Sequence, residues 1–256
     1  MLIKSNAGEN LAKTVNKVTL PIKSRSYELC IKADALRFSK LYKESVKCYL
    51  DSIMLDRNHQ EAYWGLASSY KYLTEYEKAG NILEKLIKID DKNDKYFYER
   101  GVCALSAGNP EEAIPFLIKA IVLNKENLEA QIQLAIAHEL VEEPELSLMI
   151  YNKLIETNPE FLKAYYNKGA MLMGMGDFEE ASKVFFALLK RNPDYYKAHL
   201  GIAMSFDKLG KYPEAIRYYK KFLGMKKFSE DSVFAQNRIV ELKEKLPAKK
   251  NFLRIV

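Results

Sequence analysis

The fold is decided by residues 164–193, which read AYYNKGAMLMGMGDFEEASKVFFALLKRNP. The apolar and small residues of this stretch recur at helical spacing in two sets: Tyr165, Gly169 and Leu172, then Ala181, Phe185 and Leu188. Residues 174–177 separate the two sets and carry the glycines and the aspartate of a turn. Pro193 ends the second set, because the residue before a proline disfavours helical backbone. The stretch therefore predicts two helices joined by a short turn.

The same pattern occurs six times between Ser26 and Ser229 at a period of 34 residues, without insertion or deletion. Two columns hold small residues: Ala33, Ala67, Gly101, Ala135, Gly169 and Ala203, and then Ser45, Ala79, Ala113, Ser147, Ala181 and Ala215. A third column holds large residues: Tyr49, Leu83, Leu117, Tyr151, Phe185 and Tyr219. Small residues recur where two helices cross closely, and the large column fills the adjacent space. A fixed period of this length predicts a solenoid.

In these columns the chain resembles the tetratricopeptide repeat proteins. The fifth unit, residues 162–195, carries the clearest match, and the resemblance covers 204 of the 256 residues. The first unit departs from the family pattern at Ser45, Ser52 and Arg57, and the second and third lack the proline that ends the unit. The resemblance implies an all-α, right-handed solenoid of helix pairs, in which the first helix of each pair lines a concave groove.

The period sets the expected boundaries. The expected repeat units are 26–59, 60–93, 94–127, 128–161, 162–195 and 196–229. Residues 230–246 are expected to form a capping helix, because Ser229 is a good N-cap and Pro247 ends the segment. Before the repeats, residues 1–25 form a basic segment that is either flexible or a short amphipathic helix around Leu11, Val15 and Val18.

The positive charge lies outside the repeats. The net charge is +6, of which residues 1–25 carry +4 and residues 247–256 carry +3, so residues 26–246 carry −1. A nucleic-acid surface needs basic residues clustered on a folded face. We therefore expect neither nucleic-acid nor membrane binding, except weak electrostatic contact through the tails.

No catalytic constellation is found, and we expect neither a cofactor nor a metal. His138 and His199 fall in core columns, and His59 falls in a turn. The three cysteines, Cys30, Cys48 and Cys103, have no paired spacing, so neither a disulfide framework nor a zinc site is indicated. The N-terminus lacks an apolar secretory core. These features predict a cytoplasmic protein that is not an enzyme.

The expected groove face is apolar, which is typical of an interaction site. The residues that we expect to contact a partner are Trp64, Tyr72, Tyr98, Ile132, Ile136, Tyr166, Asn167, Met173, Lys197 and Met204. Some family members hold a partner's C-terminal carboxylate with lysines, asparagines and arginine, but only Asn167 and Lys197 match those positions here. We therefore predict a protein-binding scaffold whose groove takes an apolar or amphipathic peptide or helix.

Two alternatives stay open. The N-terminal segment could reach the groove or the first unit of a second copy, which would make the protein a self-associating assembly protein and a homo-oligomer. The basic tails, with Lys249, Lys250 and residues 252–256, could instead attach the chain to an anionic membrane or to nucleic acid.

Overall fold

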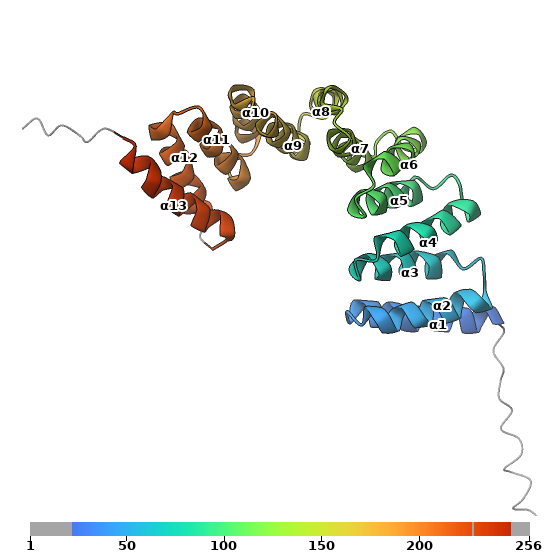
Figure 1. Ribbon diagram of the computed structural model, residues 1–256. Coiled ribbons are helices and arrows are strands. Elements are labelled where there is room, and N and C mark those ends of the chain that lie inside the picture. Colours follow the sequence, from blue (N-terminus) through green and yellow to red (C-terminus); the bar gives the residue numbers. More distant parts are fainter. Residues whose placement is uncertain (1–21, 227, 247–256) are drawn as a thin grey trace, which may run out of the picture. The chain divides into compact units, whose positions relative to one another are not determined.

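The computed structural model describes residues 22–226 and 228–246, and all regular secondary structure within them is α-helical. The chain forms two compact units that divide between Asn109 and Pro110. Unit 1 holds α1 (Ile22–Phe38), α2 (Tyr42–Leu55), α3 (Gln60–Tyr72), α4 (Tyr76–Ile89) and α5 (Asp94–Ser106). Unit 2 holds α6 (Pro110–Leu123), α7 (Leu128–Leu140), α8 (Pro144–Thr157), α9 (Leu162–Gly174), α10 (Phe178–Arg191), α11 (Tyr196–Lys208), α12 (Tyr212–Met225) and α13 (Glu230–Glu244). Within each unit, successive helices pack as hairpins (Figure 1).

The prediction of an all-α helical repeat is confirmed, since each 34-residue unit contains two of these helices. The division into two units falls inside the third repeat, between α5 and α6. One expected boundary is wrong: residues 22–25, assigned to the N-terminal segment, form the first turn of α1. Leu11, Val15, Val18 and residues 247–256 lie outside the described residues.

The turn inside each hairpin has a recurring left-handed residue. Positive φ angles occur at Lys40, Thr74, Gly108, Glu142, Gly176 and Gly210, which are spaced by the repeat period. In each loop, the residue that follows the positive-φ residue donates its backbone amide to a carbonyl near the end of the first helix. An example is Asp177 N to Leu172 O at 2.9 Å. This bond closes a helix C-terminus of the Schellman type. Glycine accepts the left-handed backbone at low cost, whereas the β-branched Thr74 at φ 59° is strained.

The turn that joins one repeat to the next explains why proline is dispensable in the first three repeats. In these units Asp56, Asp90 and Asn124 follow the second helix, and each side-chain oxygen accepts the amide two residues ahead at 3.0–3.1 Å. These Asx turns reverse the chain at the position where Asn158-Pro159 and Asn192-Pro193 do so later. The helices α2, α4, α6, α8 and α10 therefore end in the same register, with or without proline.

The columns found in the sequence form the core. All six members of the large column are buried, and so are the residues of both small columns. Phe185 shows why one small residue must be glycine: a Cβ built on Gly169 or on Gly201 would lie 2.7 or 2.5 Å from its ring. Phe185 thus lies between two helices that approach closely only because both lack a side chain there.

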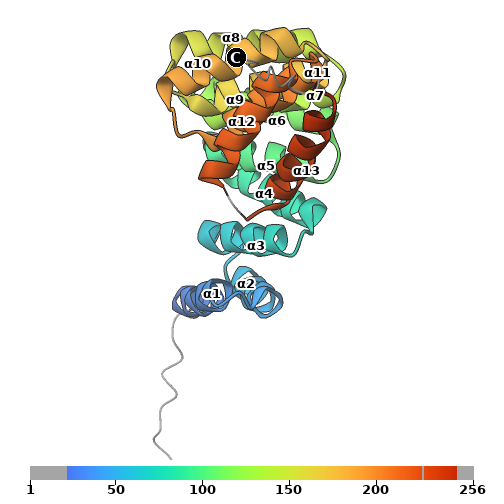
Figure 2. The ribbon, with the colours of Figure 1, turned by 90° about the vertical axis from the view of Figure 1, so that its left-hand side faces the viewer.

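Ser52, one of the two serines that replace alanines in the first repeat, takes part in a buried hydrogen-bond network with Ser26 and His59. Ser26 Oγ lies 2.9 Å from Ser52 O and 2.7 Å from His59 Nδ1, and Ser52 Oγ donates to Ser26 O at 2.8 Å. These bonds join the start of α1 to the end of α2, which lie side by side in Figure 2. His59, expected in a turn, does precede α3 but is only 2% exposed, so it is also a core residue.

Candidate partner-binding sites

Trp64 lines a cleft of about 390 Å³ in unit 1. Its ring centroid lies 5.6 Å from that of Tyr96 of α5, with the planes at 42°. The other lining residues come from α1, α3 and α5 and the turn before α5: Asp34, Arg37, Gln60, Glu61, Gly65, Asn93 and Lys95. An aromatic wall with a few polar groups is the usual composition of a cleft that orients a ligand.

A buried tyrosine contacts two of the residues that line this cleft. Tyr49 of α2 donates its hydroxyl to Asp34 Oδ1 at 2.7 Å and accepts a hydrogen bond from Arg37 Nε at 3.1 Å. Arg37 Nη2 also lies 2.8 Å from Asp34 Oδ1. Burial raises the pKa of Tyr49, and its hydrogen bond to Asp34 acts in the same direction. The hydroxyl therefore stays protonated, and the phenol, the carboxylate and the guanidinium satisfy one another.

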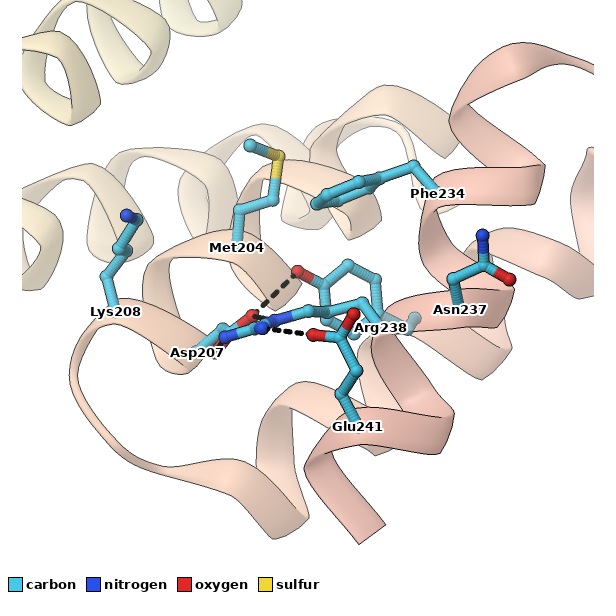
Figure 3. A pocket seen from close by; sticks show the side chains of 8 residues that line it. Met204, Asp207, Lys208, Phe234, Asn237, Arg238 and Glu241 are labelled. Carbon is cyan, nitrogen blue, oxygen red and sulfur yellow. Dashed lines mark hydrogen bonds and ion pairs between the residues drawn. The ribbon is translucent and has the colours of Figure 1, made fainter. Parts of the chain in front are cut away.

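A second cleft, of about 470 Å³, lies between α11, α12 and α13 in unit 2. Figure 3 shows Arg238 of α13 pointing at Asp207 of α11, with Glu241 beside it and with Met204 and Phe234 along the opposite wall. Arg238 Nε lies 2.6 Å from Asp207 Oδ2, and Arg238 Nη2 lies 2.9 Å from Asp207 Oδ1. Tyr219 of α12 donates to Asp207 Oδ2 at 3.2 Å, and Arg238 Nη1 lies 2.5 Å from Glu241. Hydrogen bonds to Asp207 and Glu241 raise the pKa of Arg238, so its guanidinium is charged at neutral pH.

The two clefts lie at equivalent positions of different repeats. Tyr219 stands in the register of Tyr49, and Phe234 stands in the register of Trp64. From the sequence α13 is expected only as a cap, and the pair of Asp207 and Arg238 was not predicted. The signal was present, because extending the columns by one period places α13 as the first helix of a seventh unit.

The other predicted residues of unit 1 lie apart from the Trp64 cleft. Tyr72, at the end of α3, is 62% exposed and stacks on Tyr42, with ring centroids 4.7 Å apart. Tyr98 of α5 is half-buried.

In unit 2 one predicted contact residue is wrong. Ile132 of α7 is fully buried in the core, where it packs with Ala135, Tyr151 and Leu154, so it has no surface to offer. Ile136, Tyr166, Met173 and Met204 are half-buried and pack against the edges of the core clusters, and Met204 also lines the second cleft.

Tyr166 is held by its own neighbours. Its ring lies 6.2 Å from that of Phe185 and 5.8 Å from that of Tyr195. The ammonium of the exposed Lys197 lies 5.6 Å from the Tyr166 centroid, and Asn167 is half-buried on the same helix. Lys197 and Asn167 are thus near one aromatic side chain, without the further cations that carboxylate binding requires.

The histidines and cysteines do not form a reactive group. His138 Nδ1 lies 2.6 Å from Glu143, and His199 Nε2 lies 3.1 Å from the carbonyl of Pro193. Burial raises the pKa of the Cys30 and Cys103 thiols to about 11, which makes both poor nucleophiles. Within residues 22–226 and 228–246, no three histidine, cysteine or acidic side chains are placed to hold a metal ion. None of the helices described is both long enough and apolar enough to span a bilayer.

Two family models described as tetratricopeptide repeat match this chain, one over residues 60–93 and the other over residues 166–230. The chain is a tetratricopeptide repeat (TPR) protein. The matched residues include α3, which carries Trp64, and α11 and α12, which line the second cleft.

Similar proteins include a TPR repeat-containing protein of Methanocaldococcus jannaschii, which is 23% identical over 82% of this chain and 44% of its own length. The chain spans less than half the length of the curated relatives it matches. Among solved structures, PilW, a type IV pilus biogenesis factor, superposes with a TM-score of 0.67 at 17% identity, over 84% of this chain and 98% of PilW. YrrB, a TPR protein with an unusual peptide-binding site, superposes with a TM-score of 0.53 at 19% identity, over 74% of this chain and 97% of YrrB. At these identities the superpositions establish the fold alone.

Proposed function

We propose that this TPR protein is a non-enzymatic, cytoplasmic scaffold that binds a segment of a protein partner on the face formed by the first helices of its repeats. TPR repeats are in general protein-interaction modules. The peptide-binding site named for YrrB is consistent with a peptide ligand. The partner segment carries an apolar or aromatic residue that packs on Trp64.

The cleft at Trp64 carries this proposal. Tryptophan is enriched among the residues that dominate binding energy, and these residues lie in pockets from which neighbours exclude water. Trp64 is half-buried on α3, so its ring is fixed by Tyr96 while one side faces the cleft. Gln60 and Asn93 add amide groups that suit an extended backbone or polar side chains of a partner.

Trp64→Ala is therefore expected to weaken partner binding by about 2 kcal/mol, roughly a thirtyfold rise in Kd. The measurement is affinity capture from a native lysate, followed by titration of the captured partner. Met149→Ala is the matched control, because Met149 is a large apolar side chain, 65% exposed, on the second helix α8. If the partner binds Trp64→Ala as tightly as the wild type, Trp64 is not the anchor.

Self-association is a second candidate, favoured by the outer face of α1. Tyr27, Ile31 and Phe38 of this helix are 51%, 68% and 75% exposed. In a solenoid, an apolar end of this kind is normally covered by a cap or by another chain.

Ile31→Glu is expected to reduce the mass of any oligomer to that of a monomer, because a charge would then lie in the apolar contact. Light scattering over a range of protein concentrations measures this. A mass that equals the monomer in the wild type, or an oligomer that survives the substitution, argues against self-association through α1.

A further inference from the structure

Three of the large column residues are tyrosines, and the hydroxyls of two of them donate to an aspartate that also binds an arginine. The Tyr49 hydroxyl contacts Asp34 and Arg37, and the Tyr219 hydroxyl contacts Asp207, which Arg238 binds with two nitrogens. In both sites a phenol, an aspartate and an arginine form one closed group.

The third tyrosine lacks this group. Tyr151 of α8 is fully buried, and its hydroxyl has no hydrogen-bond partner within the described residues. Glu139 of α7 stands in the register of Asp207, two repeats earlier. Asp207 accepts a hydrogen bond from the hydroxyl of Tyr219, so the same register brings Glu139 to the side of α7 that faces Tyr151. Burial raises the pKa of Tyr151, the negative charge of Glu139 acts in the same direction, and Ser147 lowers it.

The site at Tyr151 and Glu139 has no arginine within the described residues. Two repeats before Arg238 the chain has Ala170 on α9, which is exposed and too short to reach either group. Glu139 is exposed to solvent, and the structure records no ion pair or side-chain hydrogen bond for it within residues 22–226 and 228–246. The third site therefore keeps its carboxylate and its phenol but has no guanidinium.

The residues around Glu139 that correspond to the lining of the Arg238 cleft are mostly apolar. Ile136, Leu140, Tyr166 and Met173 stand where Met204, Lys208, Phe234 and Glu241 line the cleft at Arg238. The cleft at Arg238 is lined by two acidic and two basic side chains. Among the residues at the equivalent positions two repeats earlier, Glu139 is the single charged side chain. A cation flanked by apolar groups complements this set better than an anion or a neutral polar group.

We propose that Glu139 and Tyr151 bind an arginine side chain of the protein partner, in the place that Arg238 fills at the end of the chain. The guanidinium forms two parallel hydrogen bonds with a carboxylate, as Arg238 does with Asp207. The buried Tyr151 hydroxyl then donates to the carboxylate of Glu139, as that of Tyr219 does to Asp207. Lysine offers a single point charge and fits this fork less well. This inference rests on the proposed function for the identity of the partner as a protein, but the site is testable without one.

The first test supplies the arginine from the chain itself. Ala170→Arg places a guanidinium in the register of Arg238, and Ala170→Gln is the matched control, with a similar stem and no charge. We expect Ala170→Arg to raise the folding equilibrium constant about tenfold over Ala170→Gln in urea unfolding. In a Glu139→Gln background this difference should vanish. Equal stability of the arginine and glutamine variants, or a gain that persists without Glu139, would overturn the proposal.

The second test uses acetyl-arginine amide as a probe of the wild-type chain. We expect it to cause saturable shifts of the Ala170 and Met173 amide resonances, and acetyl-lysine amide to bind at least threefold more weakly. Glu139→Gln should abolish the shifts, whereas Glu156→Gln, which removes an exposed carboxylate of α8, should leave them. Shifts that survive Glu139→Gln, or no shifts at all, contradict the site. Neither test involves Trp64, so the arginine site can fail while the scaffold function stands, and the reverse.

Discussion

Gly201→Ala is expected to lower the free energy of unfolding by about 2 kcal/mol, although alanine is the better helix former. A Cβ at Gly201 would lie 2.5 Å from the ring of Phe185, which is 1% exposed. The ring has little room to move away, because its opposite edge packs so closely on α9 at Gly169 that a Cβ built there would lie 2.7 Å from it. Urea unfolding of the purified variant measures the effect.

Gly174→Ala is the control for this substitution. Gly174 is the last residue of the first helix α9, and a Cβ there would meet no atom within 4 Å. It should therefore gain up to about 1 kcal/mol from helix propensity alone. Phe185→Leu should restore much of the loss in Gly201→Ala, since Leu83 and Leu117 in the same column face the larger Glu99 and Gln133 in the register of Gly201. A Gly201→Ala variant as stable as the wild type would mean that the helices can separate freely.

Asp207→Ala is expected to cost about 2–3 kcal/mol, because it leaves two partners without their acceptor. The Asp207 side chain is 8% exposed, whereas that of Arg238 is 28% exposed and retains Glu241, which limits the loss. The Tyr219 hydroxyl, on a fully buried residue, would lose its hydrogen-bond acceptor.

Thermal or urea unfolding checks this cost, and Glu241→Gln provides the comparison. Glu241 is 56% exposed and contacts only one nitrogen of Arg238, so its substitution should cost less than about 1 kcal/mol. If both variants lose the same stability, the Asp207 pair does not hold α13 on the repeats.

The fold could be predicted almost completely, because each structural requirement recurs at a fixed period. Close helix crossings need small residues, and the space beside them needs one large residue, so Ala33 or Phe185 can be recognised from their columns alone. The unit boundary at Asn109 could not be found in this way, since it depends on contacts between helices and leaves the period unchanged.

The site was predicted less well, because a helical position does not determine how much of a side chain its neighbours cover. Ile132 and Trp64 share one column, yet Ile132 is buried in the core while Trp64 lines a cleft. Hydrogen bonds between columns were also missed. The tyrosines Tyr49, Tyr151 and Tyr219 have Arg37, Glu139 and Asp207 twelve residues before them, whereas Leu117 and Phe185 have Leu105 and Met173. Leu83 is the exception, since Lys71 precedes it and pairs with Glu99 instead. This pairing of polar with polar residues is visible in the sequence once the structure shows that the two columns meet.

The central claim is that a partner segment packs on Trp64, and the emission of this residue tests it most directly. The chain contains one tryptophan, so its fluorescence reports on this cleft alone. A peptide from the captured partner should shift the emission to shorter wavelength as the ring loses water, with the same Kd that calorimetry gives. Binding detected by calorimetry with unchanged Trp64 emission would contradict the account.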